Sequence, residues 1–88
     1  MSELQVFILK NCPYCRKALV YLEELQQEEK YKDIKIKFID EAIEKDLANS
    51  YDYYYVPSFF FNEVKLAEGA VDLNDVRNVL DRKSTRLN

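Results

Sequence analysis

Two cysteines, separated by a proline and a tyrosine, are the side chains of this chain best suited to chemistry. They are Cys12 and Cys15 in the stretch KNCPYCRK, and the 88 residues hold no other cysteine. Two thiols at this spacing can form a redox pair, supply half of a metal site, or be two small buried residues. A tetrahedral zinc site usually takes four cysteine or histidine ligands, so zinc would need a second copy of this histidine-free chain. The absence of histidine also excludes Cys–His and Ser–His–Asp catalysis within the chain.

The residues around the pair predict that it lies between a strand and the start of a helix. Residues 4 to 9, LQVFIL, form an apolar run rich in strand-forming residues. After the pair, apolar residues recur at three- and four-residue steps as far as Leu25, which is typical of an amphipathic helix. Pro13 suits the first helical position, because a missing N–H costs nothing there. Cys12 would then lie at the mouth of the helix and Cys15 about one turn inside it.

This placement suits a redox pair, because the attacking sulfur must be a thiolate. The unpaired N–H groups and the positive dipole end at a helix N-terminus stabilise a thiolate. Lys10, Arg16 and Lys17 are the cations near enough in sequence to help. We therefore interpret Cys12 as the nucleophile and Cys15 as the resolving thiol, with two inert cysteines as the alternative.

The rest of the chain predicts an α/β fold with the element order β-α-β-α-β-β-α. The stretch DIKIKFID predicts a strand with Ile34, Ile36 and Phe38 on its inner face, and a short helix is expected over residues 43 to 49. SFFF and VKLAE are expected to form an antiparallel hairpin around a two-residue turn, and Asp72 can cap a final helix. We expect a four-stranded mixed sheet with helices on both faces, in which the first two strands are parallel.

Residues 4 to 80 resemble the glutaredoxin and thioredoxin group of small thiol-disulfide oxidoreductases, in element order and in three motifs. CPYC at residues 12 to 15 is the pair most typical of dithiol glutaredoxins. VP at residues 56 and 57 is similar to the Val–Pro of the group, whose proline is cis and faces the sulfurs. EGAV at residues 68 to 71 lies where the group has a glycine-containing turn before the last helix. The resemblance implies a thioredoxin-like fold and thiol-disulfide oxidoreductase activity.

The resemblance also implies which residues surround the catalytic pair. The backbone of Val56 would offer an unpaired strand edge to an extended peptide or to glutathione. The residues expected to bind substrate or glutathione are Lys10, Pro13, Tyr14, Val56, Pro57, Gly69, Ala70 and Asp72. Two features depart from glutaredoxins: Gly69 is followed by Ala70 rather than by a second glycine, and Lys10 lies two positions before the first cysteine rather than three. Both weaken the expected glutathione site and favour a thioredoxin-type partner.

A run of tyrosines precedes Val56. Strand alternation would turn Tyr53 and Tyr55 one way and Tyr54 the other. The run can be core packing with one exposed ring, or an aromatic rim that grips a peptide substrate.

Three classes of function fit these residues. The favoured class is a glutaredoxin-like enzyme that reduces protein or glutathione mixed disulfides, with glutathione as electron donor and no tightly bound cofactor. A thioredoxin-like enzyme supplied by a thioredoxin reductase is the nearest alternative. The resemblance also allows an iron–sulfur carrier, which the tyrosine and second cysteine of CPYC disfavour, or a binding module that keeps only the fold.

The overall composition limits the partners. With 13 basic and 16 acidic side chains, the net charge of -3 argues against nucleic acid or an acidic membrane surface as a partner. The N-terminus lacks the pattern of a signal peptide and no long apolar run is present, so we expect a cytoplasmic protein. We also expect it to be a monomer. We expect residues 1 to 80 to form one domain. Residues 81 to 88, DRKSTRLN, form a polar tail that is either a non-native read-through or an ordinary frayed terminus.

Overall fold

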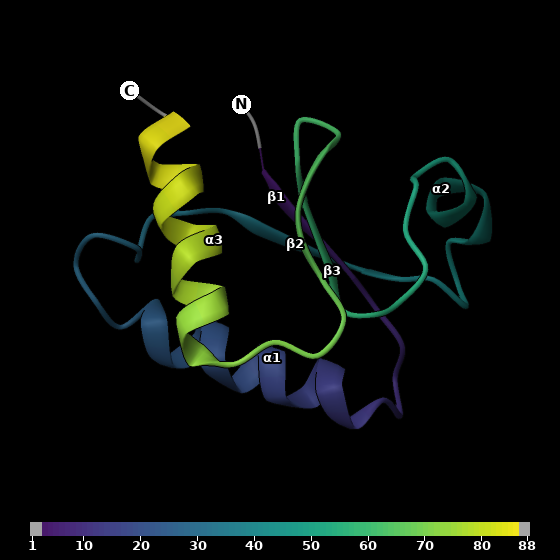
Figure 1. Cartoon of the computed structure of the whole chain (residues 1–88), viewed down its shortest axis with the longest axis horizontal. Helices are drawn as coiled ribbons and strands as arrows, with labels where there is room; N and C mark the ends of the chain where they lie inside the picture. Colours follow the sequence, from purple (N-terminus) through teal and green to yellow (C-terminus); the bar gives the residue numbers. More distant parts are fainter. Residues whose placement is uncertain (1–2, 87–88) are drawn as a thin grey trace.

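The order of elements follows the prediction. The computed structural model describes residues 3 to 86, with side chains as far as Arg82. Its elements are β1 (Leu4–Ile8), α1 (Pro13–Leu25), β2 (Ile36–Asp40), α2 (Lys45–Asn49), β3 (Ser58–Phe61), β4 (Val64–Glu68) and α3 (Leu73–Arg86). This is the thioredoxin-like β-α-β-α-β-β-α arrangement (Figure 1).

The four strands form one mixed sheet in the order β2-β1-β3-β4. β1 pairs in parallel with β2 and antiparallel with β3, so Val6 lies between Phe38 and Phe59. β3 and β4 form the expected antiparallel hairpin. Its turn residues Asn62 and Glu63 have φ values of 50° and 66°, the left-handed conformation that two-residue hairpin turns require. The parallel and antiparallel pairings both agree with the sequence prediction.

Both faces of the sheet are covered, which explains why β1 is apolar except at Gln5. Val6 faces the cluster formed with α1 and α3, and its neighbour Phe7 faces the cluster on the side of α2. Figure 1 shows α1 and α3 on one side of the sheet and α2 on the other. The larger core comprises Leu4, Val6, Ala18, Leu22, Leu25, Tyr31, Ile34, Phe59, Phe61, Val76, Val79 and Leu80. A central strand that is buried on both faces brings the chain directly to the cysteine pair.

The second strand differs from the prediction. β2 begins at Ile36, and Phe38 is 43% exposed although its predicted face is the inner one. β2 is an edge strand, so Phe38 has neighbours on one side only, while Ile39 on the opposite face is fully buried. The pattern indicated the strand correctly but assigned its buried face incompletely.

The second helix is shorter than predicted, because a turn around Asp40 occupies its expected start. The carbonyl oxygen of Asp40 accepts hydrogen bonds from the N–H groups of Ile43 (3.0 Å) and Glu44 (2.9 Å). The Asp40 carboxylate accepts another from Ala42 at 2.9 Å. α2 therefore begins only at Lys45, and Ile43 is left 74% exposed.

The last helix extends beyond residue 80, where the sequence suggested that the domain ends. α3 spans Leu73–Arg86, and the buried hydroxyl of Tyr31 donates a hydrogen bond to the carboxylate of Asp81. Within residues 3 to 86, no helix has the length and apolar character needed to cross a membrane.

Candidate active site around Cys12 and Cys15

Cys12 lies at the N-terminus of α1. It occupies the N-cap position with Pro13 as the first helical residue. Its carbonyl oxygen accepts the first helical bond, from the N–H of Arg16 at 3.1 Å. The first turn holds no acidic residue, so no carboxylate opposes a negative charge there. The helix start therefore favours a thiolate at Cys12, as the sequence indicated.

Cys15 lies one turn further on and is buried. Its side chain is 1% exposed, whereas Cys12 is half-buried, and both are free thiols in this structure. The N–H of Leu9 donates to the Cys15 sulfur at 3.5 Å, which ties the end of the β1 connection to α1. Cys12 is thus the more accessible of the two thiols.

The two thiols depart from their ordinary acidity in opposite directions. Partial burial acts to raise the pKa of Cys12, but the hydrogen bonds from the backbone and thiol of Cys15, the N–H of Tyr14 and the charge of Arg16 together hold it below the ordinary 9.0. Burial raises the pKa of Cys15 to about 11, and the negative charges of Cys12 and Glu41 act in the same direction. The accessible sulfur is therefore the one more readily ionised.

The turn before β3 brings Val56 to the cysteine pair. The Val56–Pro57 peptide bond is cis, as the resemblance implied. The Cys12 thiol points at the carbonyl oxygen of Val56, with 4.0 Å between sulfur and oxygen. Among residues 3 to 86, neither backbone group of Val56 has a backbone hydrogen-bond partner. The Val56 backbone thus remains free to pair with another extended chain.

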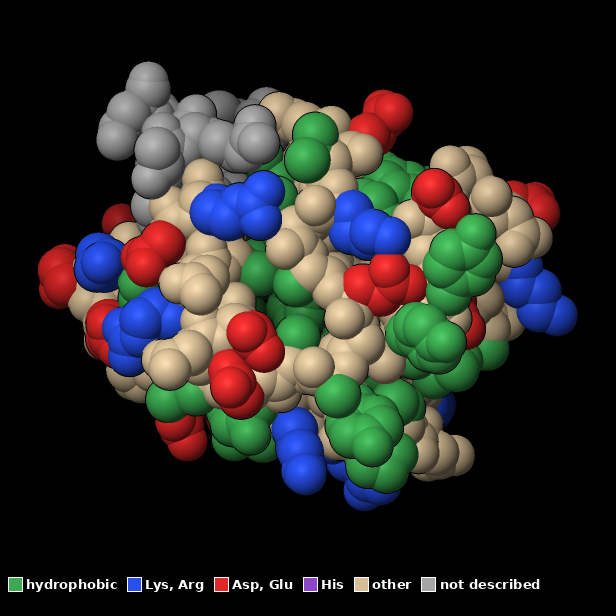
Figure 2. All heavy atoms as spheres, viewed as in Figure 1, with side chains coloured by type: hydrophobic (Ala, Val, Ile, Leu, Met, Phe, Trp, Pro, Cys, Tyr) green, Lys and Arg blue, Asp and Glu red, His purple; other side chains and the backbone are tan. Residues whose placement is uncertain are grey.

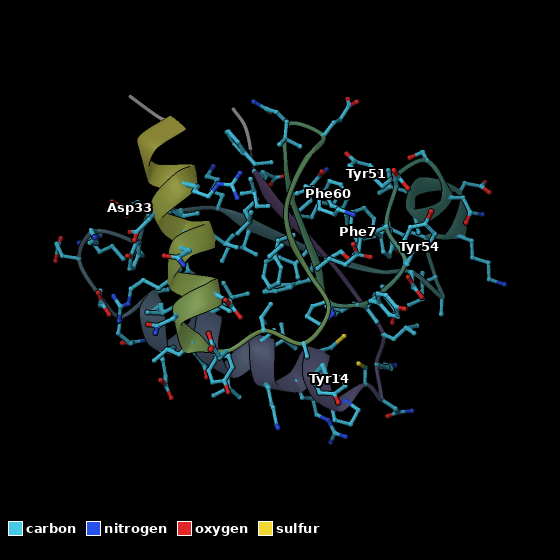
Figure 3. The ribbon with its side chains drawn as sticks, viewed as in Figure 1. Phe7, Tyr14, Asp33, Tyr51, Tyr54 and Phe60 are labelled. Carbon is cyan, nitrogen blue, oxygen red and sulfur yellow. The ribbon has the colours of Figure 1, made fainter. Side chains whose placement is uncertain are left out.

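The other residues expected to bind substrate fall into two groups. Tyr14 is 53% exposed and lies next to the two sulfur atoms in Figure 3. Pro13 is exposed as the first residue of α1, and Lys10 lines an open hollow of about 510 Å³ together with Cys12 and Ile43. These residues all lie close to the accessible thiol.

The second group follows β4. Gly69, with φ of 84°, donates its N–H to the carbonyl oxygen of Pro57 at 2.8 Å, so it supports the segment that reaches the site. Ala70 lines a separate hollow with residues of α3. The carboxylate of Asp72 caps α3 by accepting from the N–H of Asp75 at 2.8 Å. Ala70 and Asp72 therefore each make structural contacts with α3.

The tyrosine run divides between core and surface. Tyr51 and Tyr53 pack on Phe7, with ring centroids 4.9 and 5.0 Å away, whereas Tyr54 and Tyr55 are 83% and 69% exposed. The predicted alternation is wrong here, because residues 54 to 57 form bends rather than a strand. The two exposed rings come directly before Val56, and Figure 2 shows hydrophobic side chains gathered on this side of the molecule.

Two carboxylates near the site were not identified from the sequence. Glu41 accepts a hydrogen bond from the hydroxyl of Tyr53 at 2.5 Å and is joined to β1 through its N–H and the carbonyl oxygen of Ile8 at 3.0 Å. Burial and the neighbouring Glu41 raise the pKa of Tyr53. Glu68 accepts from the N–H groups of Tyr54 and Tyr55. Both contacts cross a dozen or more residues, and no local motif in the sequence marks them.

The part of the chain that the structure describes contains no group of three or more histidine, cysteine or acidic side chains placed to hold a metal ion.

Comparisons with known proteins support the fold. No family model matches the chain, and no curated protein matches its sequence. A solved structure described as a malarial protein superposes with a TM-score of 0.71 at 21% identity, over 93% of this chain and 96% of that one. A designed protein, characterised by backbone chemical shifts, gives a TM-score of 0.69 at 21% identity, over 100% of this chain and 77% of its own. At these identities the likeness concerns the fold alone.

Proposed function

We propose that this protein is a glutaredoxin-like thiol-disulfide oxidoreductase that reduces disulfides through Cys12 and Cys15. The proposal rests on the difference in accessibility and pKa between the two thiols at the start of α1. Cys12 is accessible and its pKa is lowered, while Cys15 is buried with its pKa raised to about 11. A nucleophile and a resolving thiol need this division of roles.

The first step would be attack by the Cys12 thiolate on one sulfur of a substrate disulfide. The substrate S–S bond breaks, a mixed disulfide forms at Cys12, and the departing thiolate takes a proton from water. An extended substrate would pair with the free backbone of Val56, whose carbonyl oxygen lies 4.0 Å from the Cys12 sulfur. This pairing would align the scissile disulfide with the nucleophile.

The second step would release the reduced substrate. Cys15 gives its proton to solvent and attacks the Cys12 sulfur, so that a Cys12–Cys15 disulfide forms and the substrate leaves as a thiol. Burial is the largest cause of the raised pKa of Cys15, and the charge and hydrogen bonding of Cys12 also raise it. Formation of the mixed disulfide removes the charge on Cys12, which lowers the pKa of Cys15 when its thiolate is needed. Two electrons pass from the cysteine pair to the substrate.

Glutathione is the electron donor that we propose for returning the pair to the dithiol form. Two glutathione molecules would supply the two electrons and leave as glutathione disulfide. The Ala70 that follows Gly69, and the use of Asp72 as a helix cap, argue for loose binding of glutathione. We also propose that the enzyme is a cytoplasmic monomer that acts on disulfide-containing proteins or glutathione mixed disulfides. Its net charge of -3 disfavours nucleic acid and acidic membranes as partners.

Turnover measured with two reducing systems side by side tests this proposal. The purified protein is supplied with glutathione and glutathione reductase, or with NADPH and a thioredoxin reductase. The substrates are insulin and a glutathione mixed disulfide. We expect turnover with glutathione on both substrates. Turnover only in the thioredoxin reductase system would mean that this reductase, and not glutathione, is the electron donor. No reduction in either system would favour a binding module. A brown protein after anaerobic purification would favour an iron–sulfur carrier.

A further inference from the structure

We propose that Glu68 is a positioning residue for disulfide reduction, because it holds the chain segment 54 to 57 in the conformation that presents Val56 to a polypeptide substrate. The inference rests on the proposed function and adds a residue and a preferred class of substrate to it, namely disulfides carried by extended polypeptide.

One carboxylate oxygen of Glu68 makes the principal contacts. Glu68 is the last residue of β4, and its Oε2 accepts hydrogen bonds from the N–H groups of both Tyr54 and Tyr55, the latter at 2.8 Å. Its Oε1 pairs with the ammonium group of Lys65 at 2.7 Å. Hydrogen bonds to an ionised acceptor are stronger than those between neutral groups. Two consecutive amides on one carboxylate oxygen therefore fix the direction of the chain as it enters the site.

The remaining anchors of this segment are Ser58, the first residue of β3, and Gly69, which directly follows β4. The hydroxyl of Ser58 donates to the carbonyl oxygen of Tyr55, and the N–H of Gly69 donates to that of Pro57 at 2.8 Å. Val56 lies between these anchors without a backbone partner of its own among the described residues. The segment is thus fixed on both sides of the one residue that is left open to a substrate.

The ionisation of Glu68 makes this anchor independent of pH. The ion pair with Lys65 and the N–H groups of Tyr54 and Tyr55 lower the pKa of Glu68 to about 2. The carboxylate stays charged at every pH at which the cysteine pair can react. Substrate binding at Val56 would therefore not change with pH on account of Glu68.

A polypeptide substrate depends on this segment more than a small disulfide does. An extended chain would hydrogen-bond to the Val56 backbone and lie against the exposed rings of Tyr54 and Tyr55, both carried by the segment that Glu68 holds. In Figure 3, Tyr54 lies at the connection between α2 and β3, and Tyr14 lies at the start of α1. A small disulfide reaches the Cys12 sulfur without using either feature.

Kinetics with two substrates test the inference. Glu68→Ala, Glu68→Gln and Lys65→Ala are compared with the parent protein on insulin and on bis(2-hydroxyethyl) disulfide, with dithiothreitol as the reductant. We expect Glu68→Ala to raise KM for insulin about tenfold, the equivalent of one lost hydrogen bond to a charged group. Its kcat/KM for the small disulfide should stay within about twofold of the parent value, a change below 0.5 kcal/mol.

Two variants separate positioning from general destabilisation. Glu68→Gln keeps an oxygen that can accept from the two amides and should recover most of the activity on insulin. Lys65→Ala removes the ion pair but leaves those amide bonds, so it should resemble the parent protein. Amide hydrogen exchange should be faster at Tyr54 and Tyr55 in Glu68→Ala alone.

The possible failures are distinguishable. Equal losses on insulin and on the small disulfide, or an unchanged KM for insulin in Glu68→Ala, would overturn the positioning role while leaving the oxidoreductase intact. A parent protein that reduces neither substrate would overturn the proposed function and the role of Glu68 with it.

Discussion

Cys12 and Cys15 have the same intrinsic acidity, and their different positions on α1 shift their pKa values in opposite directions. Cys12 receives hydrogen bonds at the open end of α1, whereas Cys15 is enclosed one turn later at 1% exposure. The difference in acidity between the two thiols therefore depends on where α1 begins. Pro13 sets that point, because proline is favoured at the first position of a helix and disfavoured further inside.

The two thiols should titrate in different pH ranges. The rate of alkylation of Cys12 should rise to a plateau with a midpoint below 9.0, because its pKa is lowered. Cys15 should react only as the pH approaches about 11, where it ionises in the folded protein. Iodoacetamide labelling followed by peptide mass spectrometry measures both rates, and similar midpoints would contradict the assignment of roles.

The raised pKa of Cys15 also makes stability depend on pH. A folded pKa above the unfolded value means that folding favours the protonated thiol. That contribution is fully present below pH 9.0 and is lost as the pH rises through about 11.

At the level of secondary structure, the caps and turns explain which parts of the site could be predicted. The strand before the cysteines, the helix after them and the hairpin followed from local patterns, because each element carries its own periodicity and turn residues. The start of α2 could not be predicted, since the turn around Asp40 competes with the helix pattern. Glu41 and Glu68 were missed because their partners lie 12 and 13 or more residues away.

The cap of α3 gives a prediction that separates structure from binding. Asp72 and Asp75 each accept a hydrogen bond from the N–H of the other, at 2.8 and 3.0 Å. Asp72→Ala should lower the free energy of unfolding by about 1 kcal/mol, and Asp72→Ser, another good cap, by less. Urea unfolding measures this loss. Reduction of a glutathione mixed disulfide should be unchanged in both variants, and a specific loss of that activity would instead place glutathione at Asp72.

For the whole molecule, a contact between distant parts of the chain joins α3 to the loop after α1. The buried Tyr31 donates a hydrogen bond to Asp81, and Lys30 forms an ion pair with the same carboxylate at 3.3 Å. Tyr31 and Asp81 are 50 positions apart, so the first residue of the predicted polar tail makes a contact with the rest of the fold. The sequence offered no sign of this contact, because an acidic residue among polar neighbours resembles an ordinary surface residue.

Removing this acceptor should destabilise the fold without affecting the chemistry. Asp81→Ala leaves the buried hydroxyl of Tyr31 without this acceptor, which should lower the free energy of unfolding by about 1–3 kcal/mol. Asp81→Asn keeps an acceptor oxygen and should cost less. The Tyr31 hydrogen bond is the main cause that lowers the pKa of Asp81, so its contribution is present above the unfolded pKa and is lost as the pH falls through the folded value. Equal stabilities of the two variants in urea would argue against the contact.

Trapping the covalent intermediate tests whether Cys12 attacks the substrate disulfide and Cys15 resolves the mixed disulfide. Cys15→Ser and Cys12→Ser are each mixed with oxidised glutathione at pH 7, and the intact masses are recorded over time. We expect rapid addition of one glutathione to Cys15→Ser, located on Cys12 by peptide mapping. We expect little addition to Cys12→Ser, because its remaining thiol is buried and has a raised pKa. Faster addition to Cys12→Ser, or no addition to either variant, would contradict these roles.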